Sequence, residues 1–181
     1  MPKTDNLSQE ICGMLFDVRR SIRYHTRRRL FFDRINKWSD AITAISGSGT
    51  IISILSNTGA QTATTILAAI TAIASVINLV FDTKGNARAH HDFARQFIQI
   101  EKELIKKNVT EEELEKLIAQ RLDIEAEEPP VLRVLDSMCH NELLKAMGYE
   151  ETEFLKISLP QSFLSPFIDF FPSYIKKTSN A

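Results

Sequence analysis

The sequence predicts an all-α protein in which a long N-terminal helix runs into a two-helix transmembrane hairpin, followed by a small cytosolic helical region. Three observations predict this class. Residues 41–81 contain no Asp, Glu, Lys, Arg or His, although a quarter of the 181 residues are charged. Apolar residues recur at helical spacing on both sides of this stretch. No segment shows the alternation of apolar and polar residues that is typical of a strand.

The charge of the chain changes along its length. Residues 1–40 carry nine Lys/Arg against five Asp/Glu, whereas residues 82–181 carry thirteen against eighteen. The two cysteines, Cys12 and Cys139, lie far apart and lack the spacing of metal ligands, which predicts neither a disulfide framework nor a structural zinc site. The chain also lacks the common catalytic and phosphate-binding motifs. We therefore expect no enzyme, no cofactor and no metal.

The first part of the chain predicts three consecutive helical segments. The apolar spacing favours one long helix over about residues 7–37. The charge-free stretch then divides at the turn-forming residues 57–60. This division gives candidate spans near residues 38–56 and 61–81, each of about twenty residues, the length that crosses the hydrocarbon core of a bilayer. Helical spacing continues to about residue 107, which predicts that the second span extends into the cytosol.

Residues 109–181 predict a separate cytosolic helical region, beside a two-transmembrane domain over residues 1–108. Thr110 and Glu113 have the spacing of a capping box, which opens a helix of about fifteen residues that ends at Pro129 and Pro130. A further helix over residues 131–147 is closed by Gly148.

The C-terminal tail, from Leu159 onward, is rich in phenylalanine and proline. Its prolines forbid a regular third span. We expect the tail to clasp the cytosolic helices, with an interfacial membrane segment as the alternative.

The flanks of the two spans predict the orientation of the hairpin. Basic residues precede the first span and follow the second, whereas the connecting turn is uncharged, so the positive-inside rule places both termini in the cytoplasm. We expect the basic residues before the first span to contact lipid headgroups rather than nucleic acid: Arg27, Arg28, Arg29, Arg34 and Lys37.

Each span carries a seam of small polar residues on one helix face. The first seam consists of Thr43, Ser46, Thr50, Ser53 and Asn57. The second consists of Thr64, Thr71, Ser75, Asn78 and Asp82. Two interpretations remain open. The seams face each other or neighbouring subunits as packing surfaces, or one of them lines a water-filled path in an oligomer.

Two pairs of residues are expected to meet because antiparallel helices bring positions equidistant from a turn to the same height. Counting outward from the turn places Arg34 opposite Asp82, which predicts a salt bridge at the membrane surface. The same count places His25 opposite His91. For this pair we expect a hydrogen-bonded packing role, with titration near neutral pH or metal binding as the rival interpretation.

Part of the chain resembles a known family, over roughly residues 12–108. The resemblance rests on residues 20–25 (RSIRYH), residues 27–32, Trp38, residues 45–52 (ISGSGTII), residues 78–82 (NLVFD), and residues 87–97 with His90 and His91. These segments look like the SLATT domain, the SMODS and SLOG-associating two-transmembrane effector of bacteria.

The resemblance implies a homo-oligomeric pore-forming effector of anti-phage defence. Such a protein would disrupt the inner membrane of an infected cell and stop its growth, as in abortive infection, together with a nucleotide-signalling or sensor protein. The alternative is a non-conducting, membrane-anchored scaffold that recruits a cytosolic partner. A soluble helical bundle, with the two apolar segments as core helices, is the third interpretation.

Overall fold

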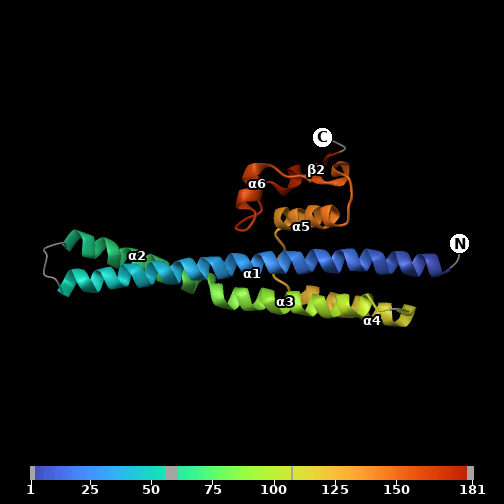
Figure 1. Cartoon of the computed structure of the whole chain (residues 1–181), viewed down its shortest axis with the longest axis horizontal. Coiled ribbons are helices and arrows are strands. Elements are labelled where there is room, and N and C mark those ends of the chain that lie inside the picture. The colour runs from blue at the N-terminus through green and yellow to red at the C-terminus, as the bar shows by residue number, and fades with distance from the viewer. Residues whose placement is uncertain (1–2, 56–60, 107, 179–181) are drawn as a thin grey trace. The chain divides into compact units, whose positions relative to one another are not determined.

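The protein is all-α, apart from one minimal pair of strands (Figure 1). The computed structural model describes residues 3–55, 61–106 and 108–178. The chain divides into two compact units, one formed by residues 1–27 and 91–181 and the other by residues 28–90. The long helix α1 (Lys3–Leu55) contributes residues to both units.

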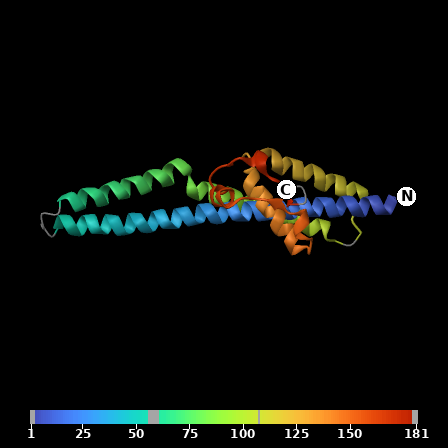
Figure 2. The same ribbon diagram turned by 90° about the horizontal axis from the view of Figure 1, so that it is seen from above.

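The unit of residues 28–90 is built around a helical hairpin. It contains the second part of α1 and α2 (Gln61–Phe81), which lie side by side in both views (Figures 1 and 2). The bounds of α2 coincide with the second predicted span. The turn-forming residues 57–60 lie outside the described residues.

One turn residue, Asp82, separates α2 from α3 (Thr83–Leu104), where the sequence predicts that the second span runs on as a helix. Asp82 adopts a positive φ of 38°, and its Oδ1 accepts a hydrogen bond from the backbone N–H of Gly85 at 3.2 Å. A Cβ atom at Gly85 would lie 2.0 Å from Oδ2 of Asp82, so any other residue would displace this carboxylate. Asp82 therefore caps α3 and begins a new helix.

The other unit buries its core between the first part of α1, the second part of α3 and α4 (Glu111–Glu127). Its buried apolar side chains are Met14, Val18, Phe97, Ile100, Leu104, Leu114, Leu117 and Ile124. The predicted capping box of α4 is confirmed, because the Thr110 hydroxyl accepts from Glu113 N–H and the Glu113 carboxylate accepts from Thr110 N–H.

Helix α5 (Arg133–Ala146) is closed by Gly148, two residues beyond its end, whose φ of +80° is the helix stop that the sequence predicts. The tail then forms short elements that the sequence analysis missed. Two residues of β1 (Leu155–Lys156) pair antiparallel with β2 (Lys176–Lys177), around α6 (Leu159–Leu164). Two single-turn 3₁₀ helices, residues 151–153 and 172–174, complete the tail.

One helical stretch, residues 61–104, is long and apolar enough to cross a membrane by length and composition. Only 6% of its most apolar window is buried within the chain. Among the described residues, the first predicted span does not meet the same criterion. The reason lies in residues 46–50 (SGSGT), which dilute the isoleucines around them.

Candidate functional site

The two polar seams of the hairpin face each other. The hydroxyl oxygens of Ser46 and Thr71 lie 2.6 Å apart, and the Thr64 hydroxyl donates to the Ser53 hydroxyl at 2.7 Å. At the other end of the hairpin, the buried Ser39 hydroxyl donates to the Ala74 carbonyl oxygen at 2.7 Å. These contacts join α1 to α2 in the antiparallel register that the sequence predicts.

The remaining seam residues mostly bond to their own helices. Thr50 donates to the carbonyl of Ser46, and Ser75 donates to the carbonyl of Thr71, both at 2.9 Å. Such bonds to the preceding turn satisfy a hydroxyl without water. Thr43 is half-buried. Asn57 lies outside the described residues.

Ser75 also belongs to the seam of α2, but its side chain is exposed and does not face α1. The sequence spacing places it on the seam, but α2 turns Thr71, Ala74 and Asn78 toward α1 instead. Ser75 and the exposed Ser48 of α1 are therefore hydroxyl groups available to a neighbouring molecule.

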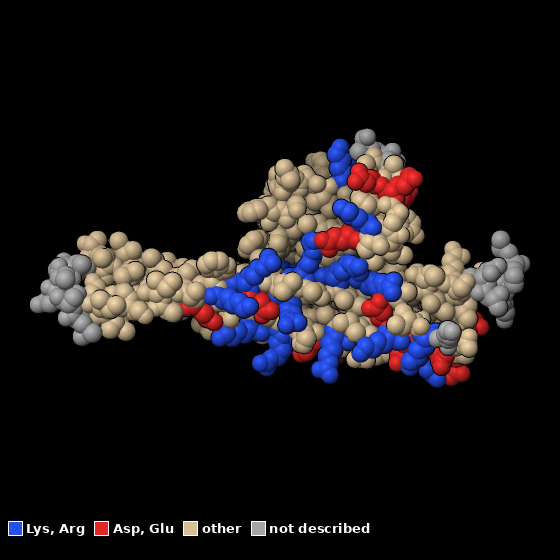
Figure 3. Space-filling model, viewed as in Figure 1, with Lys and Arg blue, Asp and Glu red and all other residues tan. Residues whose placement is uncertain are grey.

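The outer surface of the hairpin is apolar. Leu79 is 82% exposed, Ile45 is 74% exposed and Ile52 is 66% exposed. Figure 3 shows α2 and the adjoining part of α1 as a surface without Lys, Arg, Asp or Glu. These large apolar side chains are not packed against other parts of the hairpin. Together they form an exposed apolar surface, which is unfavourable in water.

A polar cluster lies where the charge-free stretch ends. Asp40 Oδ2 lies 3.9 Å from Lys84 Nζ, and its carboxylate also accepts from the side-chain amides of Asn36 and Asn78 at 3.2 and 3.4 Å. The predicted ion pair of Arg34 with Asp82 is not among the ion pairs of the described residues, because the Asp82 carboxylate caps α3.

The predicted headgroup-binding residues differ in their surroundings. Arg29 pairs with Asp33 one turn along α1, at 3.5 Å, and the Arg28 guanidinium lies 4.6 Å from the Phe32 ring centre. Arg27 pairs with Glu142 of α5. Arg34 and Lys37, nearest the apolar surface, are exposed.

The two members of the predicted histidine pair lie in different environments. His25 is buried, with Nε2 2.9 Å from Oε1 of Glu128, and its ring stacks on Phe97. His91 is exposed. Among the described residues, no group of three or more His, Cys, Asp or Glu side chains could hold a metal ion. The sequence analysis did not foresee Glu128 as the partner of His25.

His90 is a buried residue that the sequence analysis quoted only within the family resemblance. Its ring stacks on Phe32 of α1, with ring centres 5.8 Å apart. The helical spacing of Ala87, His90 and Ala94, which are all buried, could have identified it as a core position.

The C-terminal tail is attached to α5 by hydrogen bonds between side chains and backbone. Asp169 Oδ2 and Oδ1 accept hydrogen bonds from the backbone N–H groups of Arg133 and Val134, both at 3.0 Å. The Asn141 amide bonds to both the N–H and the carbonyl of Leu155. The tail thus clasps α5 of its own chain.

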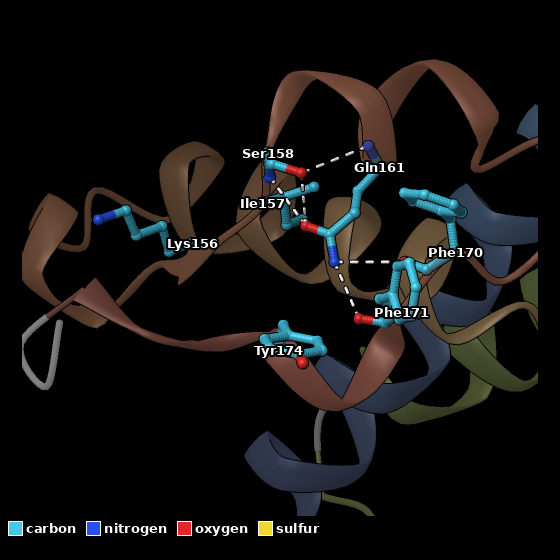
Figure 4. A pocket seen from close by; sticks show the side chains of 7 residues that line it. All are labelled: Lys156, Ile157, Ser158, Gln161, Phe170, Phe171 and Tyr174. Carbon is cyan, nitrogen blue, oxygen red and sulfur yellow. Dashed lines mark hydrogen bonds between the residues drawn. The ribbon is translucent and has the colours of Figure 1, made fainter.

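A cavity of about 470 Å³ lies within the tail (Figure 4). Gln161 stands in it, with Nε2 donating to the carbonyls of Phe170 and Phe171 and Oε1 accepting from Ser158. Its amide is therefore satisfied internally. The rings of Phe170, Phe171 and Tyr174 also line the cavity, together with Lys156 and Ile157. The buried thiol of Cys139, whose pKa burial raises to about 12, is not a nucleophile.

Comparisons with known protein families, with curated proteins and with solved structures found no match to this chain.

Proposed function

We propose that this chain is a two-span membrane effector, which assembles into a homo-oligomer and opens a pore in the inner membrane of a bacterial cell. The observation that carries this proposal is the hairpin itself. It contains 41 consecutive residues without charge, four of its hydroxyl groups pair between the two helices and many of its isoleucines and leucines are exposed.

The physical argument starts from the backbone and side-chain polar groups of the hairpin. In a hydrocarbon core each unsatisfied polar group costs several kcal/mol. The pairs Ser46 with Thr71 and Ser53 with Thr64 avoid this cost, as do the hydroxyl bonds to the preceding turn. A hairpin with these features suits lipid better than water, which supports membrane insertion of both α2 and the second part of α1.

Orientation follows from the charges at the base of the hairpin. Arg34 and Lys37 precede the first span, and Lys84 and Arg88 follow the second, so both termini are cytoplasmic under the positive-inside rule. Residues 109–181 are then cytoplasmic as well, where their acidic helix α4 is available to a nucleotide-signalling or sensor protein of the same system.

Assembly into an oligomer rests on the small exposed residues of the outer surface. Ala44 and Ser48 of α1, and Ala68 and Ala72 of α2, are exposed at spacings of four residues. Small residues at this spacing let helices approach closely in a bilayer. A single hairpin encloses no channel, so conduction requires several copies, with exposed hydroxyl groups such as Ser75 facing the water path.

The proposed biological role comes from the resemblance to SLATT effectors. Depolarisation of the inner membrane would stop the growth of an infected cell before the phage completes its cycle.

One observation favours a second candidate function, a non-conducting membrane scaffold. Because the two seams face each other, four of their hydroxyl groups are used within one hairpin and are not free to line a pore. The hairpin would then only anchor the cytoplasmic helices near a partner.

Substitution of Ser75 separates the two functions. Ser75→Leu removes an exposed hydroxyl without touching the contacts between α1 and α2, whereas Val76→Leu at the neighbouring exposed position is the matched control. Under the pore function, induced wild-type protein and Val76→Leu depolarise bacterial cells, as read with a potential-sensitive dye during phage infection. Ser75→Leu does not depolarise them.

The contrary outcomes are equally clear. Full membrane potential with all three chains, each recovered in the membrane fraction, refutes the pore and leaves the scaffold. Recovery of the chain in the cytosol without detergent refutes both membrane functions.

A further inference from the structure

An apolar groove of about 310 Å³ runs along the hairpin between α1 and α2, near the basic end of the charge-free stretch. Its walls include Phe31, Ile35, Trp38 and Ile42 of α1 and Ile77 of α2. Trp38 has the largest side chain of the groove, and it is 71% exposed. The volume lies in the range of ligand-binding pockets.

The floor of the groove offers nothing polar to a ligand. It is formed by Ser39 and Ala74, which are both buried. The Ser39 hydroxyl donates to the Ala74 carbonyl, so the hydroxyl of the lining is already used. A ligand that fills the groove must therefore be apolar along this part of its length.

Arg34 is the charged residue of the lining. Its side chain is exposed, and it belongs to none of the ion pairs formed among the described residues. The nearest carboxylates along α1 are engaged elsewhere, Asp33 with Arg29 and Asp40 with Lys84. The groove thus combines an apolar channel with a cation at its rim.

We infer that this groove binds one anionic phospholipid of the surrounding bilayer, with an acyl chain between α1 and α2 and the phosphate on Arg34. The inference rests on the proposed membrane insertion of the hairpin. From Arg34 to Ile42 the helix rises about 12 Å, which is most of one leaflet of a hydrocarbon core about 30 Å thick. Trp38 then lies near the headgroups, where its amphipathic ring is favoured.

A lipid fits these observations better than a second copy of the chain does. A second copy would fill the groove with residues of its own hairpin, which carries no Asp or Glu over residues 41–81 to pair with Arg34. A phospholipid brings the opposite charge and an apolar chain together in one molecule. Guanidinium groups also bind phosphate oxygens through two parallel hydrogen bonds.

The test uses the fluorescence of Trp38, which is the single tryptophan of the chain. The full-length protein is reconstituted into vesicles of phosphatidylcholine and phosphatidylglycerol in which one lipid or the other carries brominated acyl chains, at equal mole fraction. Bromine quenches tryptophan on contact. We expect brominated phosphatidylglycerol to quench about fivefold more efficiently, the preference that one basic charge at the surface supplies.

Variants of Arg34 distinguish a groove from a diffuse surface charge. Arg34→Gln is expected to remove the preference for the anionic lipid, and Arg34→Lys to retain part of it. Lys37→Gln is the comparison for general surface charge, because Lys37 is also predicted to contact headgroups but is not part of the groove lining. It is expected to lower the preference less than Arg34→Gln does.

Each other outcome has a distinct meaning. Absence of quenching by both lipids refutes the inserted hairpin and this inference with it. Equal quenching by both lipids, unchanged in Arg34→Gln, leaves insertion intact and overturns the lipid site. An equal loss of the preference for the anionic lipid in Arg34→Gln and Lys37→Gln overturns the site as well. Loss of the preference on adding inorganic phosphate would show that Arg34 binds a soluble anion instead of a lipid phosphate. A smaller oligomer in Arg34→Gln, without selective quenching, would show that a second copy of the chain occupies the groove.

Discussion

The hydroxyl oxygens of Ser46 and Thr71 lie 2.6 Å apart between the two helices of the hairpin. Each hydroxyl also lies within hydrogen-bond distance of a carbonyl of its own helix, Ser46 of Ile42 at 2.6 Å and Thr71 of Leu67 at 3.0 Å. Two hydroxyl protons thus serve three hydrogen bonds. One proton is shared between the helix and the partner hydroxyl, which keeps the pair satisfied without water.

This pair predicts a measurable coupling between the two helices. Ser46→Ala and Thr71→Val each remove one hydroxyl, and the double variant removes both. We expect the two single changes to be non-additive by about 0.6 kcal/mol, the usual strength of a hydrogen bond between membrane helices. Unfolding in a detergent series, followed by circular dichroism, measures the cycle.

Thr65→Val supplies the control for this cycle. The Thr65 hydroxyl is exposed and bonds to the carbonyl of Gln61 of its own helix. Combined with Ser46→Ala, it is expected to be additive. Additivity of Ser46→Ala with Thr71→Val would show that the two hydroxyl groups do not stabilise the hairpin together.

Asp169 provides a second prediction, because it caps a helix that has no capping side chain of its own. Leu132 stands at the N-cap of α5 and makes no side-chain cap. Asp169 accepts from the first two N–H groups of the helix instead, and its negative charge also lies at the favourable end of the helix dipole. Asp169→Ala is expected to cost about 1–2 kcal/mol of stability, as for other caps.

Hydrogen exchange locates this effect. In Asp169→Ala the amides of Arg133 and Val134 are expected to exchange faster, together with the amides of β1 and β2, since the tail loses one of its attachments to α5. Glu150→Ala, at an exposed acidic position outside these contacts, serves as the control. Unchanged exchange at Arg133 and Val134 would contradict the cap.

Local signals explain why parts of the fold could be predicted from the sequence. The capping box at Thr110 and Glu113, the stop at Pro129 and the turn at Gly148 each depend on residues a few positions apart. The bounds of α2 follow from the turn-forming residues 57–60 before it and from Asp82, the charged residue directly after it. Helix propensity and apolar periodicity are enough to predict these starts and stops, because each one depends on a single helix.

Contacts between distant residues could not be predicted in the same way. Asp169 lies 36 residues from the amide it caps, and Glu128 lies 103 residues from His25. Equidistance from the hairpin turn predicts the register of α1 and α2, but it takes no account of Asp82 as a helix cap. For this reason the expected bridge with Arg34 is not among the ion pairs of the described residues, while the facing seams were among the two interpretations left open.

The last prediction concerns His140 of α5, whose ring contacts the edge of Phe16 with ring centres 5.2 Å apart. Burial lowers the pKa of His140, and the charges of Arg20 and Lys177 lower it further against the opposing effect of Asp136 and Asp17. The unfolded chain, with a histidine pKa of about 6.5, therefore binds the proton first. Neutral His140 therefore contributes to the free energy of unfolding above the pKa of the unfolded chain. This contribution is lost as the pH falls through the lowered pKa of the folded protein.

Thermal unfolding between about pH 7.5 and pH 5.5 tests this sign, in a window around the ordinary histidine pKa. The melting temperature of the wild type is expected to fall on acidification, and His140→Gln is expected to flatten this dependence. Gln99→Ala, which removes no titratable group from an exposed position of α3, is the control and should leave the slope as it is. Burial raises the pKa of Asp136, so its contribution has the opposite sign and would raise the melting temperature on acidification. A slope that survives in His140→Gln would assign the acid sensitivity to another group.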